Sequence, residues 1–350
     1  MLADSSLNTF LKGVDQFFSS LAALSWGYLL LGLLFHGFNL ALRSRAAFNV
    51  LRAAYPTERF QWRRIFGAYV AGVGFNAVVP ARGGDIIKLF LTRSSIPNSS
   101  YPAVGAGLTV DAIFDASIAI FVLIFSFTQG VFPKPPDFSK LNAFDLSYFA
   151  SHTKFTLFVL TALGIVILIA FAMLSSRVKA FWARVRQGYT ILRDRRRYFR
   201  EVYAVQFAAW LCRFAGFWFL LDAFHVGGSV RNVLLVFGVN AVSTIVPFTP
   251  GGAGVQQALL LKVFAANASG ATIAAYAVGQ QLAIAIFSFA VGFCAVVFIF
   301  KFRSFGEVIR AGKEARAAEE ADAANGGGRP TEAPAVPLAP GRRPRERRSP

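Results

Sequence analysis

Charged side chains interrupt the apolar stretches of this sequence at a few places. They are Arg82, Asp85, Lys88, Asp111, Asp115 and Arg213. A charge at the centre of a membrane helix costs about 2.5–3.5 kcal/mol on insertion scales, so each one needs a compensating interaction. One hypothesis is that the charges pair with one another, for example Arg213 with Asp115, and hold helices together. The other is a polar, water-accessible cavity in which Arg82 and Arg213 attract an anionic group.

Two clusters of glycine and proline also break apolar runs, and a short helix-like piece follows each. The first cluster holds Gly83 and Gly84, and the second holds Pro250, Gly251 and Gly252. A helix that begins directly after such a cluster aims free backbone N–H groups and the positive end of its dipole into the membrane interior. Phosphate is the natural ligand of that arrangement. The alternative is a tight turn that binds no ligand.

Signatures of enzymes and metal sites are missing from the sequence. Cys212 and Cys294 stand in apolar runs without a second thiol or a histidine at ligand spacing, which predicts packing roles. The histidines are isolated, and no nucleophile triad, HExxH helix, phosphate-binding loop or dinucleotide fingerprint occurs. We therefore expect no catalytic residues, no metal and no cofactor.

The elements that must position these residues are membrane helices. The chain has 350 residues, of which 55% are hydrophobic and 15% charged, too apolar to cover itself with a soluble surface. A helix needs about 20 apolar residues to cross the hydrocarbon core. Apolar blocks of about this length cover residues 20–42, 103–127, 153–174, 203–224 and 271–300. The sequence predicts an all-α integral membrane protein with about five spanning helices.

The distribution of the positive side chains behind the net charge of +18 indicates a membrane topology. Lys and Arg gather in residues 43–64, 177–200 and the tail, so these segments should face the cytoplasm, and the loop holding Lys140 should face outside. Nucleic-acid binding is not expected, because anionic lipid explains the charge. Residues 1–19 and 177–200 each have the pattern of an amphipathic interfacial helix. Residues 301–350 lack a core-forming pattern and predict a disordered basic cytoplasmic tail.

The two broken stretches predict re-entrant hairpins, because irregular backbone at membrane depth must be surrounded by protein or water. NAVVPARGGDIIK at residues 76–88 resembles NAVSTIVPFTPGGAGVQQ at residues 240–257 in the order Asn, apolar run, Pro and Gly-Gly. Landmarks in the two copies recur about 168 residues apart, as for Gly83 and Gly251. We predict a membrane domain over 20–300 with inverted repeats at about 21–130 and 202–300, linked by 131–201.

These residues resemble a known family. The matching positions are Pro80, Arg82, Gly84, Asp85 and Lys88, then Asp115, then Pro250, Gly251, Gly252, Gly254 and Val255. In this order they are similar to the transmembrane domain family of lysylphosphatidylglycerol synthetase/flippase, also called the flippase-like or UPF0104 membrane family. The resemblance covers about residues 20–300. It implies translocation of a lipid between leaflets, without a synthetase activity.

Several positions depart from the family pattern. The family commonly has Glu where Asp85 and Gln257 stand, and Arg where Lys88, Ala112 and Gln281 stand. Charges are thus softened or lost in this chain. The departures concern the residues expected to set the substrate and ion coupling, and leave the fold assignment intact.

From these observations we expect a lipid flippase or transporter of a bacterial inner membrane, with membrane lipids and envelope-lipid synthesis enzymes as candidate partners. The alternative is a membrane scaffold or an accessory subunit of a lipid-modifying enzyme. The predicted head-group site consists of Arg82, Gly83, Gly84, Asp85, Lys88, Asp115, Arg213, Pro250, Gly251, Gly252 and Gly254. In it, Asp85 and Asp115 should orient Arg82 and Arg213.

Overall fold

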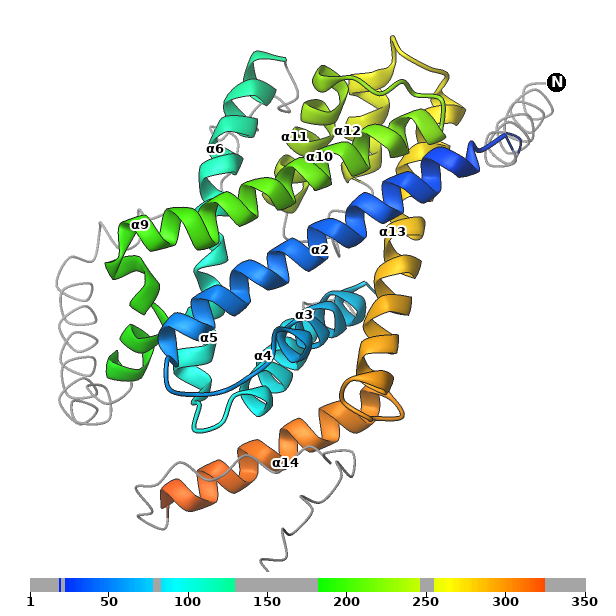
Figure 1. Cartoon of the computed structure of the whole chain (residues 1–350). Helices are drawn as coiled ribbons and strands as arrows, with labels where there is room; N and C mark the ends of the chain where they lie inside the picture. The colour runs from blue at the N-terminus through cyan, green and yellow to red at the C-terminus, as the bar shows by residue number, and fades with distance from the viewer. Residues whose placement is uncertain (1–18, 20–22, 78–82, 130–181, 246–254, 325–350) are drawn as a thin grey trace, which may run out of the picture.

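The computed structural model describes residues 19, 23–77, 83–129, 182–245 and 255–324, and every regular element in these ranges is a helix (Figure 1). The first helices are α2 (Trp26–Ala54), α3 (Trp62–Asn76), α4 (Gly83–Ser95), α5 (Tyr101–Thr109) and α6 (Asp111–Thr128). Then follow η3 (Thr190–Arg193), α9 (Arg195–Tyr198), η4 (Phe199–Tyr203), α10 (Ala204–Ala223), α11 (Val230–Ile245), α12 (Val255–Phe264), α13 (Gly270–Phe298) and α14 (Phe305–Ala324). The predicted all-α fold is confirmed.

Some predictions lie outside the described residues. They are the amphipathic helix over 1–19 apart from Ser19, the span over 153–174, the loop with Lys140, and the centres of both breaks at 78–82 and 246–254.

Three of the described helical stretches are long and apolar enough to cross a membrane. They are Tyr101–Ser126, Arg195–Ala223 and Gly270–Phe298. Each falls on one of the predicted spans at 103–127, 203–224 and 271–300. The first predicted span, at 20–42, corresponds to α2, which does not meet this criterion. His36, Asn39 and Arg43 lower its hydropathy.

Helices α2 and α10 are antiparallel neighbours along most of their length (Figure 1). The Ser25 N–H before α2 donates to the Ala223 carbonyl at the end of α10 over 3.0 Å, and at the other end the Asn49 amide donates to the Glu201 carbonyl over 2.7 Å. The helices meet at two glycines, since a Cβ on Gly32 would lie 3.1 Å from the carbonyl oxygen of Gly216. On one side of this close contact, polar residues of both helices line a common cavity.

Helices α3 and α4 form a tighter pair. A Cβ on Gly84 would overlap the carbonyl oxygen of Gly72, and one on Gly72 would lie 2.7 Å from the Gly84 carbonyl oxygen. Helix α3 also packs on α13, where Gly74 faces Gly292 (Figure 1). Gly84 is therefore needed for close approach of two backbones.

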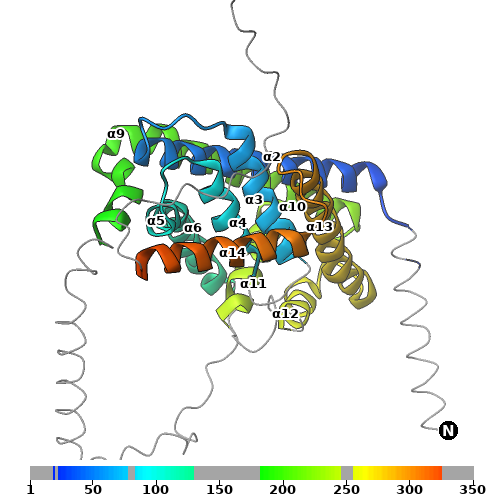
Figure 2. The same cartoon turned by 90° about the horizontal axis from the view of Figure 1, so that it is seen from below.

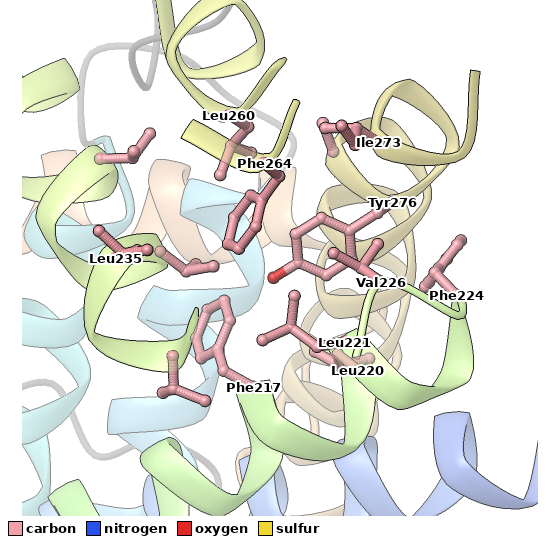
Figure 3. Close-up of a cluster of buried hydrophobic side chains, with 14 of the residues drawn as sticks. Phe217, Leu220, Leu221, Phe224, Val226, Leu235, Leu260, Phe264, Ile273 and Tyr276 are labelled. Atoms are coloured by element: carbon pink, nitrogen blue, oxygen red, sulfur yellow. The ribbon is translucent and has the colours of Figure 1, made fainter. Parts of the chain in front are cut away.

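The largest apolar cluster joins α10, α11, α12 and α13 (Figure 3). Phe217 and Leu221 of α10 lie in it beside Leu235 of α11, Phe264 of α12 and Tyr276 of α13, all buried. Because lipid tails are as apolar as these side chains, close van der Waals packing stabilises such a cluster inside a membrane. This cluster fixes α11 and α12 against the long helices.

The basic segment predicted as one interfacial helix over 177–200 is divided in its described part. Residues 182–188 are helical, η3 and α9 follow, and the Asp194 carboxylate caps α9 by accepting from the Arg197 N–H. Ile191 and Tyr198 are buried against Val50 near the end of α2. Packing on α2 thus breaks the single helix that the sequence pattern predicts.

The prediction of disorder from residue 301 onward was wrong for its first part. Residues Phe305–Ala324 form α14, which crosses beside α4 (Figure 2). Phe305 and Val308 of α14 are buried in a cluster with Phe90 of α4. Residues 325–350 lie outside the described part.

Candidate functional site

The main cavity lies between α2, α6, α10 and α11 and has a volume of about 300 Å³. Its lining combines apolar and aromatic surface with a few polar and charged groups. Those polar groups are Asn39, Arg43, Asp115, Gln206, Arg213 and Asn240. An apolar pocket with a few polar groups that converge is typical of a small-molecule binding site.

An ion pair crosses this cavity from α2 to α6. The Arg43 guanidinium lies 2.6 Å from the Asp115 carboxylate, and the side chains are 20% and 50% exposed. The predicted pairing of Asp115 with Arg213 is therefore wrong, because Arg43 of the neighbouring helix reaches the carboxylate instead. From the sequence, Arg43 counted only as a loop charge. Its spacing from His36 and Asn39, on one side of a helix, was the signal that it faces the interior.

Arg213 of α10 is held by aromatic rings. Its guanidinium carbon lies 5.1 Å from the ring centroid of Phe237 and 5.8 Å from that of Phe217. Within the described ranges, no carboxylate lies within ion-pair distance of Arg213. Cation–π contacts contribute about 0.5–2 kcal/mol. An arginine at membrane depth costs about 2.5–3.5 kcal/mol, so the rings offset only part of this cost.

Several polar atoms around the cavity are buried and have no hydrogen-bond partner among the described residues. They are Asn39 Oδ1, Arg43 Nε and Gln206 Oε1. The Gln206 amide nitrogen does donate, over 2.5 Å, to the carboxylate of Asp111, the first residue of α6. An unsatisfied buried polar atom costs about 1–3 kcal/mol, and such atoms are rare in proteins. The cavity therefore presents both donors and acceptors to an occupant.

The predicted residues of the first break form a separate network in the α3–α4 pair. Asn76 Oδ1 accepts from the Gly84 N–H over 2.7 Å, and the Asn76 amide donates to Asp85 over 3.3 Å. The Lys88 ammonium lies 3.8 Å from the Asp85 carboxylate and 5.3 Å from the centroid of the Tyr69 ring. One backbone N–H that the sequence pattern assigned to phosphate is thus bonded to Asn76.

This network lies beside the main cavity without lining it. Tyr69 of α3 neighbours Arg43 and contacts Lys88 through its ring, and so lies between Lys88 and the Arg43–Asp115 pair. Gly83, the first residue of α4, and Gly84 position Asp85 and Lys88 at the start of that helix.

A second cavity of about 230 Å³ lies between α10, α11, α12 and α13. Arg213, Phe217 and Asn240 line it, and Arg213 and Asn240 also line the main cavity. The remaining lining residues are Ser243, Gln256, Gln280, Gln281 and Ile284. Arg213 therefore lies between an ion pair on one side and a group of amides on the other.

Hydrogen bonds hold most of these amides in place. The Gln256 amide of α12 donates to Asn240 Oδ1 of α11 over 2.7 Å, and Gln257 donates to Gln281 of α13 over 3.3 Å. Sequence reasoning missed Gln206, Asn240, Gln256 and Gln280 as site residues. Their signal was present, since uncharged amides are unusual inside otherwise apolar helices.

The structure brings only some of the predicted site residues together. Asp115 and Arg213 line the main cavity, whereas Gly83, Gly84, Asp85 and Lys88 belong to the neighbouring α3–α4 network. Arg82, Pro250, Gly251, Gly252 and Gly254 lie outside the described residues.

Long apolar helices around cavities that hold arginine side chains define a membrane protein with a polar interior. Residues 5–292 match the family model described as the lysylphosphatidylglycerol synthase TM region, and the chain belongs to this family. The comparisons with curated proteins and with solved structures gave no match.

Proposed function

We propose that this chain is a lipid flippase or transporter that moves a phosphate-bearing lipid between the leaflets of a bacterial inner membrane. The observation that carries the proposal is Arg213, a cation inside the protein that faces two cavities and has no carboxylate partner in the described residues. A buried cation without an anion is costly, and a phosphate oxygen pairs with a guanidinium in charge-assisted hydrogen bonds.

The surroundings of the main cavity favour a lipid as the carrier of that phosphate. Ile118 and Val122 of α6 line the cavity, while Ile120 and Ile124 of the same helix are 62% and 63% exposed. An exposed apolar face on a membrane helix contacts lipid tails. A head group inside the cavity can thus remain attached to tails that lie in the bilayer next to α6.

The two helix pairs support the proposed re-entrant, inverted arrangement. Helices α3 and α4 have 15 and 13 residues, and α11 and α12 have 16 and 10 described residues. At a rise of 1.5 Å per residue, α3 between its caps at Gln61 and Ala77 is about 22 Å long, less than the roughly 30 Å of a hydrocarbon core. Each pair is also joined by an asparagine, Asn76 or Asn240, that accepts from the following helix.

In this proposal Arg82, which directly precedes α4 in the chain, is a second cation for the head group. The segment with Arg195 and the tail after Lys301 face the cytoplasm, according to their basic composition. Labelling of single cysteines at these positions in intact cells checks the orientation, and external labelling at position 195 contradicts it.

The test is flipping in liposomes that contain the purified full-length chain and phosphatidylglycerol labelled on an acyl chain. We expect Arg213→Gln to lower the initial rate about ten- to a hundredfold, since a hydrogen bond to a charged group contributes about 1.5–3 kcal/mol. The matched control is Arg231→Gln, because Arg231 is exposed and bonds to Gln129 away from both cavities.

An equal loss in both variants, or an undiminished rate in folded Arg213→Gln, removes Arg213 from the site. If the unaltered chain moves no phospholipid at all, the scaffold or accessory-subunit alternative takes the place of this proposal.

A further inference from the structure

The second cavity has a different chemical character from the main cavity. Its polar side chains other than Arg213 are uncharged: Asn240, Ser243, Gln256, Gln280 and Gln281. Within the described residues no aspartate or glutamate lines it, and residues 246–254, which follow α11 in the chain, contain neither residue type in the sequence. An occupant of this cavity meets amides, a hydroxyl and one guanidinium.

One of these amides has unused hydrogen-bonding capacity. Gln280 is 3% exposed, lines the cavity, and its buried Oε1 has no partner among the described residues. Because an unsatisfied buried acceptor costs about 1–3 kcal/mol, this side chain is explained by a ligand that donates a hydrogen bond. The hydrogen bond from Gln256 to Asn240 keeps the facing amides in place.

Amides suit hydroxyl groups in particular. Asn and Gln each offer an acceptor oxygen and a donor NH₂, and a hydroxyl group both donates and accepts. A primary ammonium has three donors and a charge, so it requires a carboxylate when it is buried. In this cavity it would instead meet the positive charge of Arg213.

On the basis of the proposed function, we infer that the amide-lined cavity binds an uncharged polyol head group while Arg213 holds the adjoining phosphate. The substrate class is then a phospholipid whose phosphate carries a glycerol, an inositol or one sugar ring, and a cationic aminoacyl head group is discriminated against. At about 30 Å³ per water molecule, the cavity has the volume of roughly eight waters, which suits a single small polyol.

The test compares two lipids with the same acyl label and intact head groups, phosphatidylinositol and lysylphosphatidylglycerol, in liposomes that contain the full-length chain. We expect the inositol lipid to move about tenfold faster or more, the factor that roughly one hydrogen bond provides. It should also raise the Tm of the chain in detergent more than the lysyl lipid does. Equal rates and equal shifts for the two lipids overturn the inference and leave the proposed function standing.

Variants of Gln280 connect the preference to this cavity. Gln280→Leu should lower the rate of the inositol lipid about tenfold, and Gln280→Glu should shift the preference toward the lysyl lipid. The control is Gln61→Leu, since Gln61 is exposed before α3 and lines neither cavity. If Gln280→Leu does not fold, Gln280→Glu and the lipid comparison on the unaltered chain still test whether this cavity binds the polyol.

The outcomes separate the two proposals. Selective binding of the inositol lipid without movement of either lipid supports the polyol site and overturns transport. Movement of both lipids at equal rates supports transport and overturns the polyol site. An unchanged preference in folded Gln280→Glu excludes this cavity as its origin.

Discussion

The α3–α4 pair and the α11–α12 pair are tied together in the same way but carry different chemistry. In each, an asparagine of the first helix accepts a hydrogen bond from the start of the second, Asn76 from Gly84 and Asn240 from Gln256. The first pair adds an acid and a base, Asp85 and Lys88, whereas the second adds neutral amides. The linking asparagine is thus common to both pairs, and the charges are specific to one.

The difference between the pairs indicates which of them can select a ligand. Charges at the start of α4 are satisfied within their own network and connect through Tyr69 to the Arg43–Asp115 pair. The amides of the second pair line a cavity together with Gln280 of α13, whose buried acceptor oxygen has no partner among the described residues. The charged pair therefore suits a structural role, and the amide pair suits contact with a ligand.

The largest effect is expected from Gly84→Leu in the charged pair. The new side chain would overlap the Gly72 carbonyl, which is backbone and cannot rotate away. We therefore expect the free energy of unfolding to fall by about 3 kcal/mol or more. Thermal unfolding of the detergent-purified chain measures it. Gly27→Leu in α2 is the matched control, because a Cβ there has no neighbour within 4 Å. A Gly84→Leu protein as stable as this control contradicts the close packing of α3 and α4.

A moderate effect is expected from Asp115→Asn. The change leaves the Arg43 guanidinium without its carboxylate. Because Asp115 is half exposed, we expect the free energy of unfolding to fall by only about 1–2 kcal/mol. A double-mutant cycle measures the coupling of Asp115 to each arginine. We expect coupling with Arg43→Gln and none beyond about 0.5 kcal/mol with Arg213→Gln. Coupling with Arg213→Gln and none with Arg43→Gln would instead support the pairing of Asp115 with Arg213 that the sequence suggested.

The sequence predicted the features that depend on length and composition. Three spans were found because a run of about 20 apolar residues is hard to bury anywhere but in a bilayer, as in Gly270–Phe298. The partner of Asp115 was missed because an arginine at the end of an apolar block is equally consistent with a loop charge and with an inward-facing residue. Only the packing of α2 against α10 decides this for Arg43.

Other features depended on contacts that no local pattern encodes. Helix α14 has few large apolar residues, and it was missed because its anchor is the contact of Phe305 and Val308 with Phe90 of α4. The amide cavity was missed because the amides lie on different helices, and an amide in an apolar helix does not show which other amides it faces. Three helices had to be placed around Arg213 before Asn240, Gln256 and Gln280 formed one surface.

The smallest effect is expected where α12 of the amide pair and the neighbouring α13 are given the charges of the family pattern. Gln257 donates to Gln281 over 3.3 Å, and Gln281 is exposed, so Gln257→Glu combined with Gln281→Arg replaces a hydrogen bond by a partly hydrated ion pair. Such pairs contribute about 0–1 kcal/mol, and their charges cancel, so the unfolding free energy should change by less than about 1 kcal/mol.

Gln257→Glu alone is the informative comparison for this double variant. It adds a carboxylate beside the amide cavity without the arginine at position 281, and should increase the rate of lysylphosphatidylglycerol relative to phosphatidylinositol in the same liposomes. The double variant should restore the original preference, because the new arginine neutralises the carboxylate. If the two variants show the same lipid preference, charge at this position does not reach the head group, and the contrast between the two helix pairs concerns stability alone.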